Sequence, residues 1–148
     1  MNTKKRSRSK VVKEKKKDHI PFALKVSMDV ISVKDSDTVC DVAKVLEKHR
    51  IGAVVVKSGT DMAGIISERD IVYRVVAQEK DYKALKASDI MTKEIVAVNI
   101  EDGIQAIHEQ MKKIPFRHLP VRKDNRIVGM VSNRDLMYLR RLKTIHSR

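Results

Sequence analysis

The sequence contains no tryptophan, and aromatic residues make up only 3% of its 148 residues. Any hydrophobic core must therefore be built from Val, Ile, Leu and Met side chains. The single cysteine, Cys40, excludes a disulfide within the chain and a cysteine-based metal site. No apolar run approaches the roughly 18 to 20 residues that cross a membrane, and the N-terminus lacks the apolar core of a secretory signal. We therefore expect a cytoplasmic protein without a membrane segment.

Motifs of the common enzyme classes are also missing. The sequence has no Ser-His-Asp order, no zinc-binding pattern, no Walker loop and no pair of carboxylates beside a base. Its five histidines are scattered, without the spacing of metal ligands. We therefore expect a protein that is not an enzyme and that holds no metal ion.

Acidic residues are scarce relative to basic ones, 19 against 32, and the imbalance is concentrated at the N-terminus. Residues 1–18 hold nine Lys or Arg and two acidic residues, and so carry +7 of the formal net charge of +13. Such a segment repels itself and buries no apolar surface, so we expect a disordered tail. It either binds the phosphates of a nucleic acid or ribosome, or is a solvated leader. The rest of the chain is moderately basic, which favours an anionic ligand or partner.

An internal repeat at an offset of 65 residues organises the rest of the chain. The match runs without a gap from about Lys25 to Arg141. Its sharpest part aligns Gly64–Asp70 with Gly129–Asp135, where a glycine and two apolar residues lead into Ser-x-Arg-Asp. This pattern divides the chain into three segments: the basic tail at 1–18, a first repeat with its linker at 19–88, and a second repeat at 89–148.

Both repeats predict the same order of secondary structure. The first has strands at 30–33, 52–57 and 62–67, a helix from Val39 that Thr38 and Asp41 cap, and a second helix from about Arg69. The second has strands at 95–98, 117–122 and 127–132, and helices from Ile104 and about Arg134. We expect the stretch 78–88 to continue the last helix of the first repeat.

The predicted fold class is α/β (α+β), with two tandem β-α-β-β-α units packed through their sheets with pseudo-twofold symmetry. One unit alone is too small to close a core of its own, whereas two fused copies can bury their sheets against each other. We therefore expect one globule with a shared core rather than two independent domains.

The two Ser-x-Arg-Asp sequences carry the most specific chemical signal. Each begins at an expected helix N-terminus, where free N–H groups and the helix dipole favour a phosphate. The serine hydroxyl adds a hydrogen bond and the arginine adds a charged fork for phosphate oxygens. Asp70 and Asp135 would repel phosphate, so they are better suited to ribose hydroxyls. The alternative is a capping box without a ligand, but capping does not require the arginine that both copies keep.

These features resemble the tandem pair of CBS domains, named after cystathionine β-synthase. The resemblance covers about Leu24 to Leu142, and it also includes Asp89-Ile90-Met91-Thr92 and Arg117-His118-Leu119-Pro120-Val121. It implies β-α-β-β-α twins with two clefts that bind AMP, ADP, ATP or related adenosyl compounds. It further implies a stand-alone regulatory module that acts on an unidentified partner protein and forms a flat homodimer. The helix residues expected at that dimer interface are Ile71, Val72, Val75, Leu136 and Leu139.

The resemblance also implies a set of ligand-binding residues. Asp70 and Asp135 would hold ribose, Ser67 and Ser132 ribose or phosphate, and Arg69 and Arg134 phosphate. The base pocket would be lined by Ile51, Gly52 and Ala53 in the first cleft and by Phe116, Arg117 and His118 in the second. The start of each repeat would add Ser27, Asp29, Val30 and Ile31, and Thr92, Glu94, Ile95 and Val96. Since Phe116 can stack on a base and its two neighbours can contact phosphate, we expect the second cleft to bind more tightly.

The predicted function is therefore a regulatory sensor of an adenine nucleotide. Two other classes of function stay open at this point. One is a nucleic-acid or ribosome-associated protein anchored by residues 1–18, and the other is a scaffold whose clefts bind no nucleotide.

Overall fold

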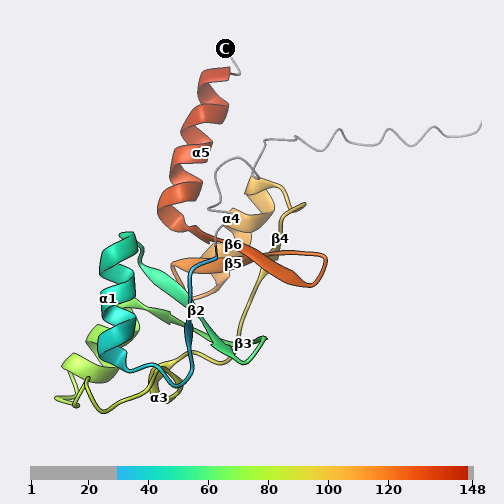
Figure 1. The fold of residues 1–148 in the computed structure, drawn as a ribbon. Coiled ribbons are helices and arrows are strands. Elements are labelled where there is room, and N and C mark those ends of the chain that lie inside the picture. Colours follow the sequence, from blue (N-terminus) through green and yellow to red (C-terminus); the bar gives the residue numbers. More distant parts are fainter. Residues whose placement is uncertain (1–29, 147–148) are drawn as a thin grey trace, which may run out of the picture.

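The computed structural model describes residues 30–146, which form two three-stranded sheets with helices packed against them (Figure 1). This arrangement confirms the predicted α/β class. The basic tail at 1–18 lies outside the described residues, as do Ser27 and Asp29, two of the expected ligand contacts. None of the helices within residues 30–146 is long and apolar enough to cross a membrane.

Each repeat has the expected order of strand, helix, two strands and helix. The first comprises β1 (Ser32–Lys34), α1 (Val39–His49), β2 (Ala53–Ser58), β3 (Asp61–Ser67), α2 (Glu68–Ile71) and the π-helical segment η2 (Val72–Val76). A short helix, α3 (Ala87–Ile90), precedes the second repeat. That repeat comprises β4 (Val98–Asn99), α4 (Ile104–Lys113), β5 (His118–Lys123), β6 (Arg126–Ser132) and α5 (Asn133–His146).

The strand register repeats with the same offset of 65 residues as the sequence. β2 pairs in parallel with β1 and antiparallel with β3, and β5 pairs in the same way with β4 and β6. Val56 pairs with Gly64 and Val121 with Gly129, and the register shifts directly after Val56 and Val121. Every pair between β2 and β3 has its counterpart 65 positions later between β5 and β6. The two repeats are therefore structural copies.

Each repeat closes its own cluster of buried apolar side chains. In the first, Val39 and Val42 of α1 belong to one cluster with Val54 and Val56 of β2. The second repeat has a separate cluster around Ile107 of α4. The expectation of a single core shared by both copies is therefore wrong, because the helices of each repeat cover the apolar face of its own sheet.

Helix α1 begins where the sequence predicts. The Oγ1 of Thr38 accepts a hydrogen bond from the backbone N–H of Asp41 at 3.1 Å, and it donates to Asp41 Oδ2 at 2.8 Å. This bond satisfies one of the backbone donors that a helix N-terminus leaves unpaired. Apolar residues at helical spacing then face β2, so the helix buries one side and exposes the other.

The last helical segment of the first repeat ends earlier than predicted. η2 ends at Val76, and turns at residues 77–79 and 82–84 replace the expected continuation through 78–88. Glu79 has a positive φ of 54°, and such a left-handed residue turns the chain away from a helical path. The chain then reaches the linker helix α3, whose Ala87 and Ile90 belong to the first core.

The residues expected at a dimer interface are mostly core residues. Val75 and Leu136 are fully buried, and Ile71 is half-buried against the first core. Only Val72 of the expected set is exposed, and the side chain of Leu139 lies outside the described part of the chain. Among the described side chains of the two segments, the other exposed apolar ones are Tyr73 and Val76 on η2 and Met137 and Tyr138 on α5. The prediction was wrong for Val75 and Leu136 because those positions face inward.

Candidate ligand-binding cleft

A cavity of about 290 Å³ lies between the two repeats. Three segments line it: the end of β3 with α2 and η2, the linker that precedes β4, and the residues that lead into β5. The predicted site residues found in its lining are Ser67, Arg69, Asp70, Thr92, Glu94, Val96, Phe116, Arg117 and His118. We call this cavity the first cleft, since it contains the Ser-x-Arg-Asp sequence of the first repeat.

The first cleft combines residues that the sequence analysis placed in different clefts. Phe116–His118 were expected beside Asp135, and His118 does pair with Ser132 in the sheet, but all three also line the same cavity as Ser67–Asp70. The linker is the reason, because the backbones of Ile65 and Thr92 exchange hydrogen bonds of 3.0 and 2.9 Å. This bridge holds the start of the second repeat against β3 of the first. The first cleft therefore includes Phe116–His118, which were predicted for the second one, and His118 lies near both Ser-x-Arg-Asp sequences.

The other predicted residues do not line this cavity. Ile31 and Ile51 pack against the first core, and Ala53 is buried. Ser132 and Asp135 lie at the junction of β6 and α5, the counterpart of the first cleft's Ser67 and Asp70. The remaining predicted residues outside the cavity lining are Val30, Gly52, Ile95 and Arg134.

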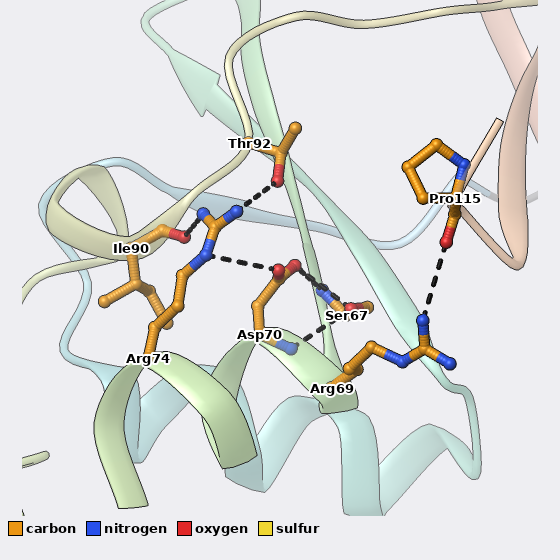
Figure 2. A network of polar contacts seen from close by, with 7 residues as sticks. All are labelled: Ser67, Arg69, Asp70, Arg74, Ile90, Thr92 and Pro115. Carbon is orange, nitrogen blue, oxygen red and sulfur yellow. Dashed lines mark hydrogen bonds and ion pairs between the residues drawn. The ribbon is translucent and has the colours of Figure 1, made fainter. Parts of the chain in front are cut away.

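Both Ser-x-Arg-Asp sequences form complete capping boxes. In the first, Asp70 Oδ2 accepts hydrogen bonds from Ser67 N at 2.8 Å and Ser67 Oγ at 3.0 Å, and Asp70 N donates to Ser67 Oγ at 3.3 Å (Figure 2). The equivalent bonds between Ser132 and Asp135 measure 2.8, 2.7 and 3.2 Å. Capping is therefore present, and in both repeats it engages only one of the two carboxylate oxygens.

This geometry changes what the serine and the helix start can offer a ligand. The hydroxyl proton of Ser67 is directed to Asp70, so Ser67 Oγ can only accept from a ligand, which suits a ribose hydroxyl and not a phosphate oxygen. The N–H of Glu68 donates to the carbonyl of Gly52 at 2.9 Å, and that of Asp70 donates to Ser67. The expected row of free N–H groups for phosphate is therefore largely occupied.

Arginine side chains supply the positive charge of the first cleft. Arg69 reaches across to the second repeat, where its Nη1 donates to the carbonyl of Pro115 at 3.5 Å. Its guanidinium carbon lies 5.8 Å from the centre of the Tyr73 ring, within the range of a cation–π contact. Arg74 and Arg117 also line the cavity. These side chains, and not the helix start, are the groups that can bind a phosphate.

His118 lies where the two repeats meet. A Cβ added to Gly52 would stand 2.8 Å from the Nε2 of His118, so only glycine leaves room for the imidazole there. Burial lowers the pKa of His118 below its ordinary value of 6.5, and Arg117 acts in the same direction, while Glu68 and Asp135 oppose the shift. The imidazole is therefore neutral at pH 7, where it can donate one hydrogen bond and accept another.

Arg74 and Tyr73 are lining residues that the sequence analysis missed. The sequence did contain a signal for Arg74. The equivalent position of the second repeat is Leu139, so the two repeats differ there by a charged and an apolar residue, one turn after the aspartate. The 65-residue offset pairs Tyr73 with Tyr138, but a pair of aromatic residues at equivalent positions does not show which cavity either one faces.

Known proteins support the repeat as the unit of this fold. The CBS domain matches residues 24–77 and 87–141. The mitochondrial CBS domain-containing protein CBSX3 of Arabidopsis thaliana is 40% identical over 106 residues, 68% of this chain and 52% of that protein. The crystal structure of the CBS-domain containing protein ATU1752 from Agrobacterium tumefaciens has a TM-score of 0.72 and 32% identity, covering 76% of this chain and 90% of that one. A hexameric CBS-CP12 protein from bloom-forming cyanobacteria has a TM-score of 0.70 and 29% identity, covering 76% and 66%.

The matched region is only part of the longer relatives. The first curated relatives are about twice as long as the matched region, since the chain spans 52% of one and 57% of the next. The tail at 1–18 precedes both matched regions. Activities and partners of the longer relatives are therefore not properties of this chain by similarity alone.

Proposed function

Because the chain belongs to the CBS-domain family, whose members are generally regulatory modules, we propose that it senses an adenine nucleotide in the first cleft and acts on a partner protein. The observation that carries this proposal is the convergence of three ligand-binding chemistries in one cavity. Ser67 and Asp70 supply hydroxyl and carboxylate acceptors that suit ribose. Phe116 supplies an exposed aromatic ring on which a base can stack. Arg69 and Arg117 supply positive charge for phosphate.

The size of the cavity favours a mononucleotide. Pockets for small molecules occupy roughly 300–1,000 Å³, and the first cleft, at about 290 Å³, lies at the lower end of that range. A dinucleotide would extend beyond the described walls. We therefore place AMP, ADP and ATP ahead of dinucleotides as candidate ligands.

The charges of the lining favour few phosphates. Three arginines face the cavity together with three acidic residues, Glu68, Asp70 and Glu94. The high net charge of the chain is therefore not concentrated in the first cleft. Each further phosphate would add negative charge near Glu68 and Glu94, so we expect AMP to bind at least as tightly as ATP.

The test is a thermal-shift and calorimetric titration of the full chain with AMP, ADP and ATP. A ligand at about 100 times its Kd stabilises the folded state by about 2.7 kcal/mol. For a chain of this size the transition should rise by on the order of 5–10 °C. Asp70→Ala should abolish the response of the first cleft, because it removes the proposed ribose acceptor.

Asp41→Ala is the matched control, since Asp41 makes two of the three kinds of capping bond that Asp70 makes but does not line the cavity. Both variants should lose about 1 kcal/mol of stability through the cap, but only Asp70→Ala should lose the nucleotide response. No response of the wild-type chain to any adenine nucleotide would reject the sensor and favour a scaffold with unused clefts.

The output of the sensor is proposed to pass through protein contacts. Both η2 and α5 carry exposed apolar side chains that a second copy of this chain would cover, and the related cyanobacterial CBS-CP12 protein is hexameric. We expect a homodimer that presents its clefts to a regulated partner. The cytoplasmic location and nucleic-acid binding by residues 1–18 stay predictions.

A further inference from the structure

The guanidinium of Arg74 contacts two residues that line the first cleft, Asp70 and Thr92, and the carbonyl of Ile90 beside it. Its Nη1 donates to the carbonyl of Ile90 at 2.6 Å, and its Nη2 donates to Thr92 Oγ1 at 3.3 Å. Its Nε lies 3.6 Å from Asp70 Oδ1. Figure 2 shows the three nitrogens facing three different acceptors, one on the helical segment and two on the linker. Arg74 therefore ties the wall that carries Asp70 to the wall that carries Thr92.

These contacts leave hydrogen-bonding capacity for a ligand on both walls. The 3.6 Å between Nε and Asp70 Oδ1 is too long for a hydrogen bond, so the ion pair adds to the capping bonds that orient the carboxylate and leaves the lone pairs of Oδ1 available. Thr92 Oγ1 accepts from Arg74, so its own proton is free to donate elsewhere. The cleft therefore presents an oriented acceptor at Asp70 and an oriented donor at Thr92.

The second repeat cannot build this arrangement. Leu139 stands at the position equivalent to Arg74, and its side chain has no polar group. The backbone differs as well, because Arg74 lies in the π-helical segment η2, whereas the equivalent stretch of α5 is a continuous α-helix. π-helical turns are rare and frequently mark functional sites. Both repeats have the capping box. The three contacts of Arg74 with Asp70, Ile90 and Thr92, which we call the arginine clasp, are specific to the first repeat.

We propose that Arg74 is a positioning residue that makes the first cleft selective for ribose over deoxyribose. This inference rests on the proposed function, and it adds a reason for selectivity to it. A hydroxyl at the 2′ position needs an acceptor held in a fixed place, and an acceptor held in place by Arg74 loses less freedom on binding than an unrestrained one. Loss of the clasp therefore affects the recognition of the sugar more than the recognition of the base or the phosphate.

The experiment measures the Kd of AMP and of 2′-deoxy-AMP by calorimetry in the Asp135→Ala background, so that only the first cleft reports. With Arg74 present, AMP should bind about tenfold more tightly or better, the effect of one hydrogen bond to a charged group. In Arg74→Leu, which copies the second repeat, the ratio of the two Kd values should fall to about one to three. Arg74→Lys should also lose most of the ratio, because an ammonium cannot contact three separated acceptors as a guanidinium does.

The two proposals fail in different ways. If Arg74→Leu weakens AMP and 2′-deoxy-AMP by the same factor, Arg74 is a phosphate contact or a purely structural residue, and the inference is overturned while the sensor stands. If the protein that retains Arg74 binds neither nucleotide, both proposals are overturned. If thermal denaturation shows that Arg74→Leu does not fold, the ratio of the two Kd values in Arg74→Lys decides, because that variant keeps the charge and the apolar stem.

Discussion

The last helical segments of the two repeats begin alike and end differently. Both start at a serine–aspartate capping box with nearly the same bond lengths. The first then becomes π-helical and stops at Val76, whereas the second continues as one α-helix to His146 and projects from the body of the molecule (Figure 1). The cap is therefore a shared structural element, and the copies differ in the helical turns beyond it.

The residues after the cap account for much of this difference. The first repeat continues with β-branched residues, Ile71, Val72, Val75 and Val76, which have lower helix propensity because their χ1 freedom is restricted. The second has Leu136 and Met137 at the first two of these positions, and both are better helix formers. Two segments with one repeated pattern can thus keep the same start and diverge in backbone.

The largest expected effect on the second of these helical segments comes from Leu136, a fully buried residue of α5. Leu136→Ala should lower the free energy of unfolding by about 2–5 kcal/mol, because it leaves a cavity in the second core. Urea denaturation measures this change. Met137→Glu is the neighbouring control, since Met137 is 62% exposed and the substitution should change the stability of a single folded chain by no more than about 0.5 kcal/mol.

The variants Leu136→Ala and Met137→Glu also distinguish a core position from an exposed position that is proposed to contact a second copy. Met137→Glu should shift the sedimentation mass toward that of a single 16.9 kDa chain, because a charge at an apolar interface is costly. An unchanged mass would show that this face does not join two copies. A loss below about 1 kcal/mol in Leu136→Ala would contradict the core assignment of that residue.

A smaller effect is expected at Gly64 of β3, which lies against the linker at Met91 and Thr92. A Cβ on Gly64 would stand 2.8 Å from the carbonyl oxygen of Thr92 and 2.8 Å from the sulfur of Met91. Because a backbone atom is involved, Gly64→Ala should cost about 1–3 kcal/mol and loosen the bridge between Ile65 and Thr92. Gly103→Ala is the control: nothing lies within 4 Å of its Cβ position, so only the modest cost of an alanine at the N-cap of α4 is expected. Equal stability of the two variants would refute the close approach.

The smallest expected effect concerns His118, which stands where the first repeat has Ala53. The pKa of His118 is lowered in the folded protein, mainly by burial, so the unfolded chain binds a proton at higher pH than the folded one. Stability should therefore fall as the pH drops below the ordinary value of 6.5. Denaturation of the wild type and His118→Asn at pH 7.5 and 5.5 tests this, and the wild type should lose more. An equal loss in both proteins would show that His118 does not contribute.

Much of the architecture could be predicted from the residues. The 65-residue offset appears again in the strand register, and the cap of α1 at Thr38 was located correctly. One helix prediction failed for a local reason, since the positive φ of Glu79 turns the chain where the helix was expected to continue. The interface prediction failed because an apolar residue on a helix can face the core or the solvent, and composition alone did not separate Val75 from Val72.

The amino-acid order was sufficient for the repeat, the fold class and the chemistry of the Ser-x-Arg-Asp sequences, because these depend on periodicity and on neighbours within a few positions. It was not sufficient to predict which residues line the first cleft. Phe116 and Asp70 line one cavity because the backbone of Thr92 bonds to Ile65, far earlier in the chain, and so carries the second repeat across the first. The three contacts of Arg74 depend on the same placement, since no local pattern indicates which distant carbonyl or hydroxyl an exposed arginine will reach.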